Sequence, residues 1–218
     1  MEICDCPGAP ALTTILRATC KQNLGQLQRF LFQRPGHVFD AAGTPTPNPI
    51  DTLASWTPLF AANNDTKVVS SPYVENFVIP RAERITEGGG DNSTIDGREI
   101  HLGWGAISAL GQVAEVPGNI IKSIKKLMCE ADLVVYPINQ YGQIIGIDAE
   151  GLAEDGTPSG KVTGIPISSF FVSDLDNNGL NTRDKGDFGF SLDFGWRDDL
   201  VMVKPDDFNA KTALWPAA

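Results

Sequence analysis

The stretch from Glu115 to Asp148 constrains the fold most, because its hydrophobic periodicity changes from that of a helix to that of strands. In its first half, lysines and a serine fill the face opposite to regularly spaced apolar residues. Those apolar residues are Ile120, Ile121, Ile124, Leu127 and Met128. The spacing is that of one helix face, and Pro117 suits a first helical turn because its missing N–H would have no partner there. The sequence therefore predicts an amphipathic helix over about residues 117–129.

Beyond this helix, two short apolar runs predict a β-hairpin. Residues 133–138 and 144–147 read as strands, and residues 140–142 lie between them as a turn. A helix followed by a hairpin is a packing unit, since the helix needs a sheet to cover and the remaining segments supply strands for it.

Residues 199–203 could form a short strand of their own, and longer strands are predicted at residues 73–79, 161–172 and 187–203. The last of these alternates most clearly, with large apolar side chains on one face and polar residues or glycines on the other. The apolar face consists of Phe188, Phe190, Leu192, Phe194 and Trp196. The chain is thus expected to be mainly β (α+β), with one packed amphipathic helix, long loops and an N-terminal arm.

The first fifty residues are expected to form an arm or an edge rather than a core. Residues 13–32 could include a short helix, and the proline-rich run 43–49 predicts a stiff, extended connector. Residues 51–218 then make a single β-rich domain.

A polar, glycine-rich segment at residues 81–98 predicts a long hairpin tip or a flexible loop. Gly88, Gly89 and Gly90 stand at its centre. Loops of this length inside a compact domain are usually functional or disordered. In a protein that assembles, these glycines would belong to an interface that becomes ordered against a neighbouring subunit.

The charge balance is acidic, with 17 Lys and Arg against 27 Asp and Glu, a net charge of −10. A surface made to grip nucleic acid needs clustered cations, so this balance argues against one. The acidic balance is compatible with a protein surface along which DNA moves without being bound. The apolar runs are too short for a membrane span, and the N-terminus lacks a signal pattern, so we expect no membrane partner and a protein made and kept in the cytoplasm.

The motif with the sharpest local pattern resembles the opening of an EF-hand calcium loop, D-x-D-x-N-G. The candidate ligands are Asp174, Asp176, Asn178 and Asp184. The glutamate that such a loop requires at its twelfth position is Lys185 here. The alternative interpretation, which we favour, is a hairpin turn in which Asp and Asn side chains bond their own backbone and Gly179 has a positive φ.

The cysteines offer a second metal hypothesis. Cys4, Cys6 and Cys20 could hold zinc together with His37, but their spacings fit no common zinc module. Reduced thiols are the favoured interpretation. No cofactor is expected, apart from the calcium hypothesis.

The sequence gives little support for a catalytic role. His37 and His101 could act as bases near neutral pH, yet each is more often structural in such a context. The chain has no nucleophile elbow, no phosphate-binding loop and no zinc-protease motif. We therefore expect no enzyme.

Three apolar residues near the C-terminus, Phe208, Leu214 and Trp215, look exposed in the sequence. Exposed apolar groups of this kind mark contact surfaces. They are therefore predicted to dock on a neighbouring subunit.

From Gly146 onward the chain resembles the C-terminal part of tail tube (major tail) proteins of long-tailed bacteriophages, especially those infecting Bacteroidetes. The resemblance lies in the helix-then-hairpin unit, the strand around residues 164–167 and the block from Gly179 to Ala210. It implies a β-sandwich or incomplete barrel flanked by a helix. It also implies subunits that close into hexameric rings, which stack into the tail tube of a virion assembled in the host cytoplasm.

The resemblance also implies partners. Copies of the chain would bind one another and other tail proteins, and an acidic lumen would let DNA pass without specific binding. Three alternatives stay open: another virion protein (a tail terminator, ring or head-completion protein), a calcium-assisted carbohydrate- or protein-binding β-sandwich module, and a hydrolase with a cleft around His37 or His101.

Overall fold

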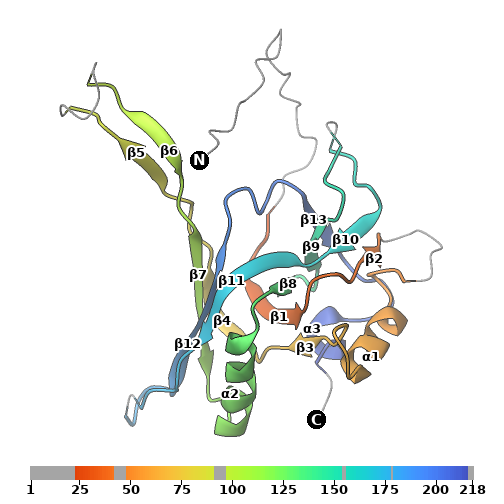
Figure 1. Ribbon diagram of the computed structural model, residues 1–218. Coiled ribbons are helices and arrows are strands. Elements are labelled where there is room, and N and C mark those ends of the chain that lie inside the picture. Colours follow the sequence, from red (N-terminus) through yellow and green to blue (C-terminus); the bar gives the residue numbers. More distant parts are fainter. Residues whose placement is uncertain (1–22, 42–47, 91–96, 154–155, 178, 216–218) are drawn as a thin grey trace.

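The computed structural model describes residues 23–41, 48–90, 97–153, 156–177 and 179–215 (Figure 1). The strands are β1 (Leu27–Gln33), β2 (Phe39–Asp40), β3 (Val69–Ser70), β4 (Val74–Val78), β5 (Arg84–Glu87), β6 (Ile100–Trp104), β7 (Ile107–Ala114), β8 (Leu133–Asn139), β9 (Ile144–Asp148), β10 (Lys161–Thr163), β11 (Ile165–Val172), β12 (Lys185–Leu192) and β13 (Leu200–Val203). The helices are α1 (Leu53–Ala61), α2 (Gly118–Lys125), the 3-10 helix η1 (Lys126–Cys129) and α3 (Ala210–Ala213). The mainly β class predicted from the sequence is confirmed.

One antiparallel sheet dominates the molecule, in the order β2-β10-β9-β8-β11-β12-β7-β4, with β1 pairing with β8 and β13 pairing with β9. The sheet curls (Figure 1), and its β4 end returns to the side of β1. There, the Ser71 backbone N–H donates to the Phe30 carbonyl at 2.8 Å. The Phe30 N–H in turn donates to the Ser71 hydroxyl at 3.0 Å. The result is a curled half-barrel.

The inside of the curl holds an aromatic core. Phe30 contacts Phe77, Phe188 and Phe190, with ring centroids 4.5 to 5.6 Å apart. A second core lies on the outer face of β1 and β8, where Trp56 of α1 packs against Tyr136. Because β8 has apolar cover on both faces, all of its residues are buried.

The helix predicted at about residues 117–129 is present as α2 followed by η1. Ile121 and Ile124 of α2 enter the inner core, as the predicted apolar face requires. Met128 is exposed instead, because the chain tightens into η1 and turns this residue outward. The structure also contains α1 and α3, which the sequence analysis did not identify as helices.

The prediction that the first fifty residues form an arm or an edge is wrong for β1. Phe30, Leu31 and Phe32 are almost completely buried, and β1 pairs along its length with β8. Consecutive residues of this strand enter the two cores in turn, so the strand lacks the one-sided pattern that would reveal it. The possible helix at residues 13–32 is likewise replaced by a strand from Leu27 onward, while residues 1–22 lie outside the described part.

The strand predicted at residues 187–203 is interrupted. Phe188, Phe190 and Leu192 are buried as expected, but β12 ends at Leu192 and Phe194 is 57% exposed. A turn follows, in which Gly195 has a φ of 82° and its carbonyl accepts from Asp198 N–H. The chain resumes as β13, paired with β9. In the part of the chain that the structure describes, no helix is long and apolar enough to cross a membrane.

Candidate functional site

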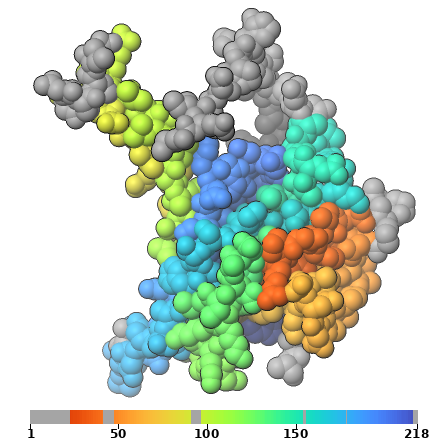
Figure 2. All heavy atoms as spheres, in the orientation of Figure 1, coloured from red at the N-terminus to blue at the C-terminus, as the bar shows by residue number. Residues whose placement is uncertain are grey.

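A two-stranded arm, made of β5 and β6, stands away from the body of the molecule (Figures 1 and 2). It continues the β4–β7 hairpin, and the Gly105 N–H donates to the Glu83 carbonyl at the joint. Its large apolar side chains are between 43% and 58% exposed. They are Ile85, Ile100, Leu102 and Trp104. We call these four residues the arm surface.

The body supports the arm at its base. The rings of Trp104 and Phe194 stack with centroids 4.6 Å apart and planes 1° apart. Beside them lies a cavity of about 420 Å³, whose lining includes Ile79, Trp104, Phe194 and Trp196. The base of the arm thus offers an aromatic hollow large enough for an apolar side chain.

The glycines predicted to belong to an interface lie at the outer end of β5. Gly88, Gly89 and Gly90 have φ values of 86°, 94° and 117°, a region that L residues rarely adopt. Residues 91–96, which follow them, lie outside the described part. The arm surface itself was missed in the sequence, although Ile100, Leu102 and Trp104 recur at the period of a strand.

The C-terminal residues predicted to dock on a neighbour pack on their own chain, so that expectation of exposure is wrong. Leu214 is fully buried in the second core, and Phe208 packs against the same cluster. Trp215 is half-buried and covers Arg29. α3 holds this segment in place, capped by the Asn209 side chain, which accepts from Lys211 N–H at 3.1 Å.

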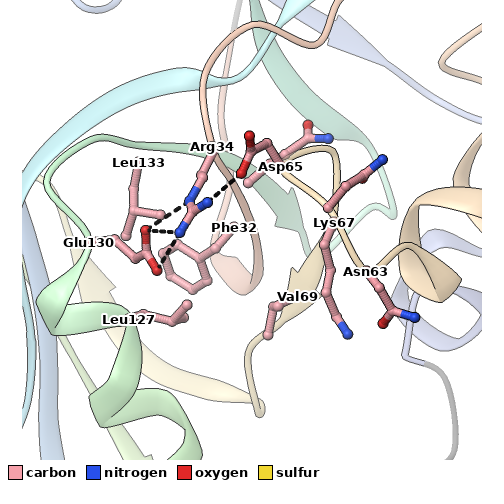
Figure 3. A pocket seen from close by; sticks show the side chains of 11 residues that line it. Phe32, Arg34, Asn63, Asp65, Lys67, Val69, Leu127, Glu130 and Leu133 are labelled. Carbon is pink, nitrogen blue, oxygen red and sulfur yellow. Dashed lines mark hydrogen bonds and ion pairs between the residues drawn. The ribbon is translucent and has the colours of Figure 1, made fainter.

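A pocket of about 370 Å³ lies between the end of β1, the segment before β3 and the end of η1 (Figure 3). Phe32, Val69 and Leu127 contribute apolar side chains to its lining. Arg34 lies beside it, and its guanidinium binds both oxygens of Glu130, with contacts of 2.9 and 3.0 Å, and also binds Asp65. Hydrogen bonds to these two carboxylates raise the pKa of Arg34. The ion pairs tie η1 to β1.

One polar group of this pocket, the Gln33 side-chain oxygen, has no hydrogen-bond partner among the residues that the structure describes. Gln33 is 2% exposed, its Nε2 donates to the Thr66 carbonyl at 2.6 Å, and its Oε1 accepts no hydrogen bond. The lining residues include no histidine, cysteine or serine. Its carboxylates, Asp65 and Glu130, are both bound by Arg34, so these charged groups of the pocket hold one another in place.

The predicted calcium loop forms a turn between β11 and β12. Asp174 pairs with Lys125, and Asp176 Oδ1 accepts from the Lys185 N–H at 2.8 Å. Gly179 has a φ of 82°, and its N–H donates to the Asn177 side chain. Asn178 itself lies outside the described residues. Among the described residues no three His, Cys, Asp or Glu side chains gather as they would around a metal, so Asp174, Asp176 and Asp184 are not brought together.

The residues considered for zinc binding and for catalysis do not form one site among the described residues. Cys4, Cys6 and Cys20 lie outside the described residues, and Cys129 is an exposed free thiol. His37 packs edge-on against Phe39, with Nε2 3.2 Å from the Asn48 amide, and burial lowers the pKa of this imidazole. His101 lies on the arm against Trp104.

Comparison with known proteins gives little further guidance. No family model matches the chain, and no curated protein matches it. One similar solved structure is the baseplate of the anti-feeding prophage, determined by cryo-EM with six-fold symmetry, at 10% sequence identity and a TM-score of 0.27. The match covers 86% of this chain and 99% of that chain. A score this low carries no weight in the functional argument.

Proposed function

We propose that this chain is a structural subunit of a bacteriophage tail, in which copies close into hexameric rings and the rings stack into a tail tube. The arm surface is the observation that carries the proposal, because it leaves large apolar side chains open on a two-stranded projection. The resemblance of the chain from Gly146 onward to tail tube proteins of phages infecting Bacteroidetes supports the same assignment.

Packing the arm against a partner would lower its free energy. A two-stranded hairpin alone is marginally stable in water, so a projecting arm benefits from a surface to pack on. Burying a large apolar side chain completely is worth about 1.5–3 kcal/mol, and Leu102 and Trp104 are roughly half open. An arm that reaches away from its own body meets a different surface on its neighbour, and repeated contacts of that kind close into rings or extend as filaments.

The charge of the chain suits a conduit for DNA. With a net charge of −10, a ring of copies would present carboxylates to a lumen, where they repel phosphate and let DNA slide. In this proposal the chain has no catalytic activity and needs no cofactor. It is made in the host cytoplasm and becomes part of the virion tail together with other tail proteins.

The experiment that tests the arm compares two charge substitutions at exposed leucines. Leu102→Glu places a carboxylate on the arm surface, and Leu180→Glu places one at a fully exposed site on the β11–β12 turn. We expect wild type and Leu180→Glu to form rings or tubes in negative-stain images. Leu102→Glu should stay monomeric with an unchanged melting temperature. Normal assembly by Leu102→Glu would remove the arm from the proposal.

A further inference from the structure

A cavity of about 350 Å³ lies where β1, β4 and the start of α2 meet, and Trp215 lines it. Arg29 of β1 also lines it, with its guanidinium carbon 4.3 Å from the centroid of the Trp215 ring. This contact is a cation–π interaction. It holds the guanidinium in one place and shields part of it from water.

Among the described residues, Arg29 has no carboxylate partner of the kind that a half-buried charge normally has. No ion pair joins it to a carboxylate of the described residues, and its Nη1 is buried without a hydrogen bond. Burial lowers the pKa of Arg29, which reflects the cost of keeping the charge away from water. Buried charges are usually paired because desolvation is expensive, so the described residues leave this charge without a carboxylate partner.

The carboxylates that line the cavity are held by other cations. Glu75 binds Arg183 at 2.7 Å and Lys185 at 3.5 Å. Glu115 lies 3.9 Å from Arg183 and is exposed. These two acidic groups therefore neutralise the Arg183 side of the cavity, and no described carboxylate pairs with Arg29.

The start of α2 forms one wall of the same cavity. Val116, Pro117 and Ile120 supply apolar walls. The cavity thus combines a guanidinium and an indole ring with apolar walls.

We propose that this cavity binds one carboxylate, supplied by an acidic side chain of a neighbouring copy of the chain. A carboxylate matches the guanidinium fork in shape and charge, and its source follows from the chain itself, which carries 27 acidic residues against 17 basic ones. The assignment of the source rests on the proposed self-assembly, whereas the assignment of a carboxylate rests on the cavity alone.

The test measures binding and assembly on the same full-length protein. A blocked glutamate and its blocked glutamine counterpart are titrated at a concentration where the protein is monomeric, and tryptophan fluorescence is followed. We expect a saturable change with glutamate only, lost in Trp215→Phe. In the Arg29→Gln variant, the affinity for the blocked glutamate should fall about tenfold or more, as when a hydrogen bond to a charged group is removed. Lys122→Gln, on the exposed face of α2, is the matched control and should bind as wild type does.

The results test separately whether the cavity binds a carboxylate and whether a neighbouring copy supplies it. Equal responses to glutamate and glutamine, or unchanged binding in Arg29→Gln, would overturn the carboxylate site. Reduced assembly of Arg29→Gln, with Lys122→Gln assembling normally, supports the neighbouring copy as the source. Normal assembly of Arg29→Gln overturns that source while the proposed function stands. Glutamate binding by a wild-type protein that never assembles overturns the proposed function and that source together. If Arg29→Gln does not fold, Arg29→Lys keeps the charge without the fork and is expected to weaken binding in the same direction.

Discussion

Trp104 and Phe194 stack face to face, with ring centroids 4.6 Å apart, and join the projecting arm to the body of the molecule. Trp104 ends β6, and Phe194 lies in the turn after β12, so two segments far apart in the sequence meet at this point. Because both rings stay partly open to solvent, their contact sets the position of the arm more than the stability of the core.

Replacing Phe194 by alanine should therefore loosen the arm and leave the core intact. We expect a loss of about 0.5–1.5 kcal/mol in local stability, the usual worth of an aromatic pair. Hydrogen exchange should become severalfold faster at the amides of β5 and β6 and stay unchanged at those of β8. Leu180→Ala is the control, since Leu180 is fully exposed. Equal exchange in Phe194→Ala and wild type would show that the stacking does not position the arm.

A close crossing of strands makes Gly146 sensitive to a single methyl group. A Cβ at this position would lie 2.6 Å from the Thr163 carbonyl oxygen and 2.7 Å from a Val162 methyl carbon. The carbonyl belongs to the backbone of β10 and cannot move cheaply, so Gly146→Ala should destabilise the fold by about 1–3 kcal/mol. Denaturant unfolding measures this loss. Gly118→Ala is the matched control, because a Cβ there meets nothing within 4 Å.

Asp148 should make the stability depend on pH in the acid range. Burial alone would raise the pKa of this carboxyl, but donors from Ser159 and the Glu150 N–H outweigh burial and lower it. A depressed pKa in the folded state stabilises the protein above the unfolded value of about 3.9. This contribution is lost as the pH falls through the folded pKa.

Unfolding free energies measured from neutral pH down to acid pH test this contribution. We expect Asp148→Asn to be less stable at neutral pH by about 1–3 kcal/mol, since asparagine keeps one acceptor oxygen but replaces the charged second one with an NH2 donor that faces a donor. Its stability should also fall less steeply with acid than that of wild type. Parallel pH curves for the two proteins would show that Asp148 does not contribute.

Calcium should leave the melting temperature unchanged. The Asp174 carboxylate is paired with Lys125, and Asp176 accepts from the backbone of Lys185, so the turn is satisfied without a cation. Calorimetry with calcium and with a chelator measures the effect. A clear rise with calcium would favour a calcium-assisted binding module and weaken the tail assignment.

Local patterns predicted the central elements of this fold well. α2, β8 and β9 were visible because each carries a full periodic signal within its own residues. β1 was hidden because Phe30 and Leu31 are adjacent yet enter different cores, which breaks any one-sided alternation. The path of the chain after Leu192 was also hidden, since the alternation continues to Phe194 although the strand has ended.

The candidate surfaces were harder to predict than the fold. Whether Leu214 or Leu102 is open depends on which segments fold back on the body, and this is a property of tertiary packing. α3 buries Leu214, whereas the arm leaves Leu102 exposed. The same holds for Arg29, because only the packed structure shows that none of the described carboxylates around the cavity pairs with it.

The size of the wild-type assembly shows whether copies of this chain form a tube. Light scattering across a range of protein concentrations, with negative-stain images of the same samples, would measure it. We expect rings with a central hole that stack into tubes. A monomer that stays unchanged as the concentration rises would contradict this expectation.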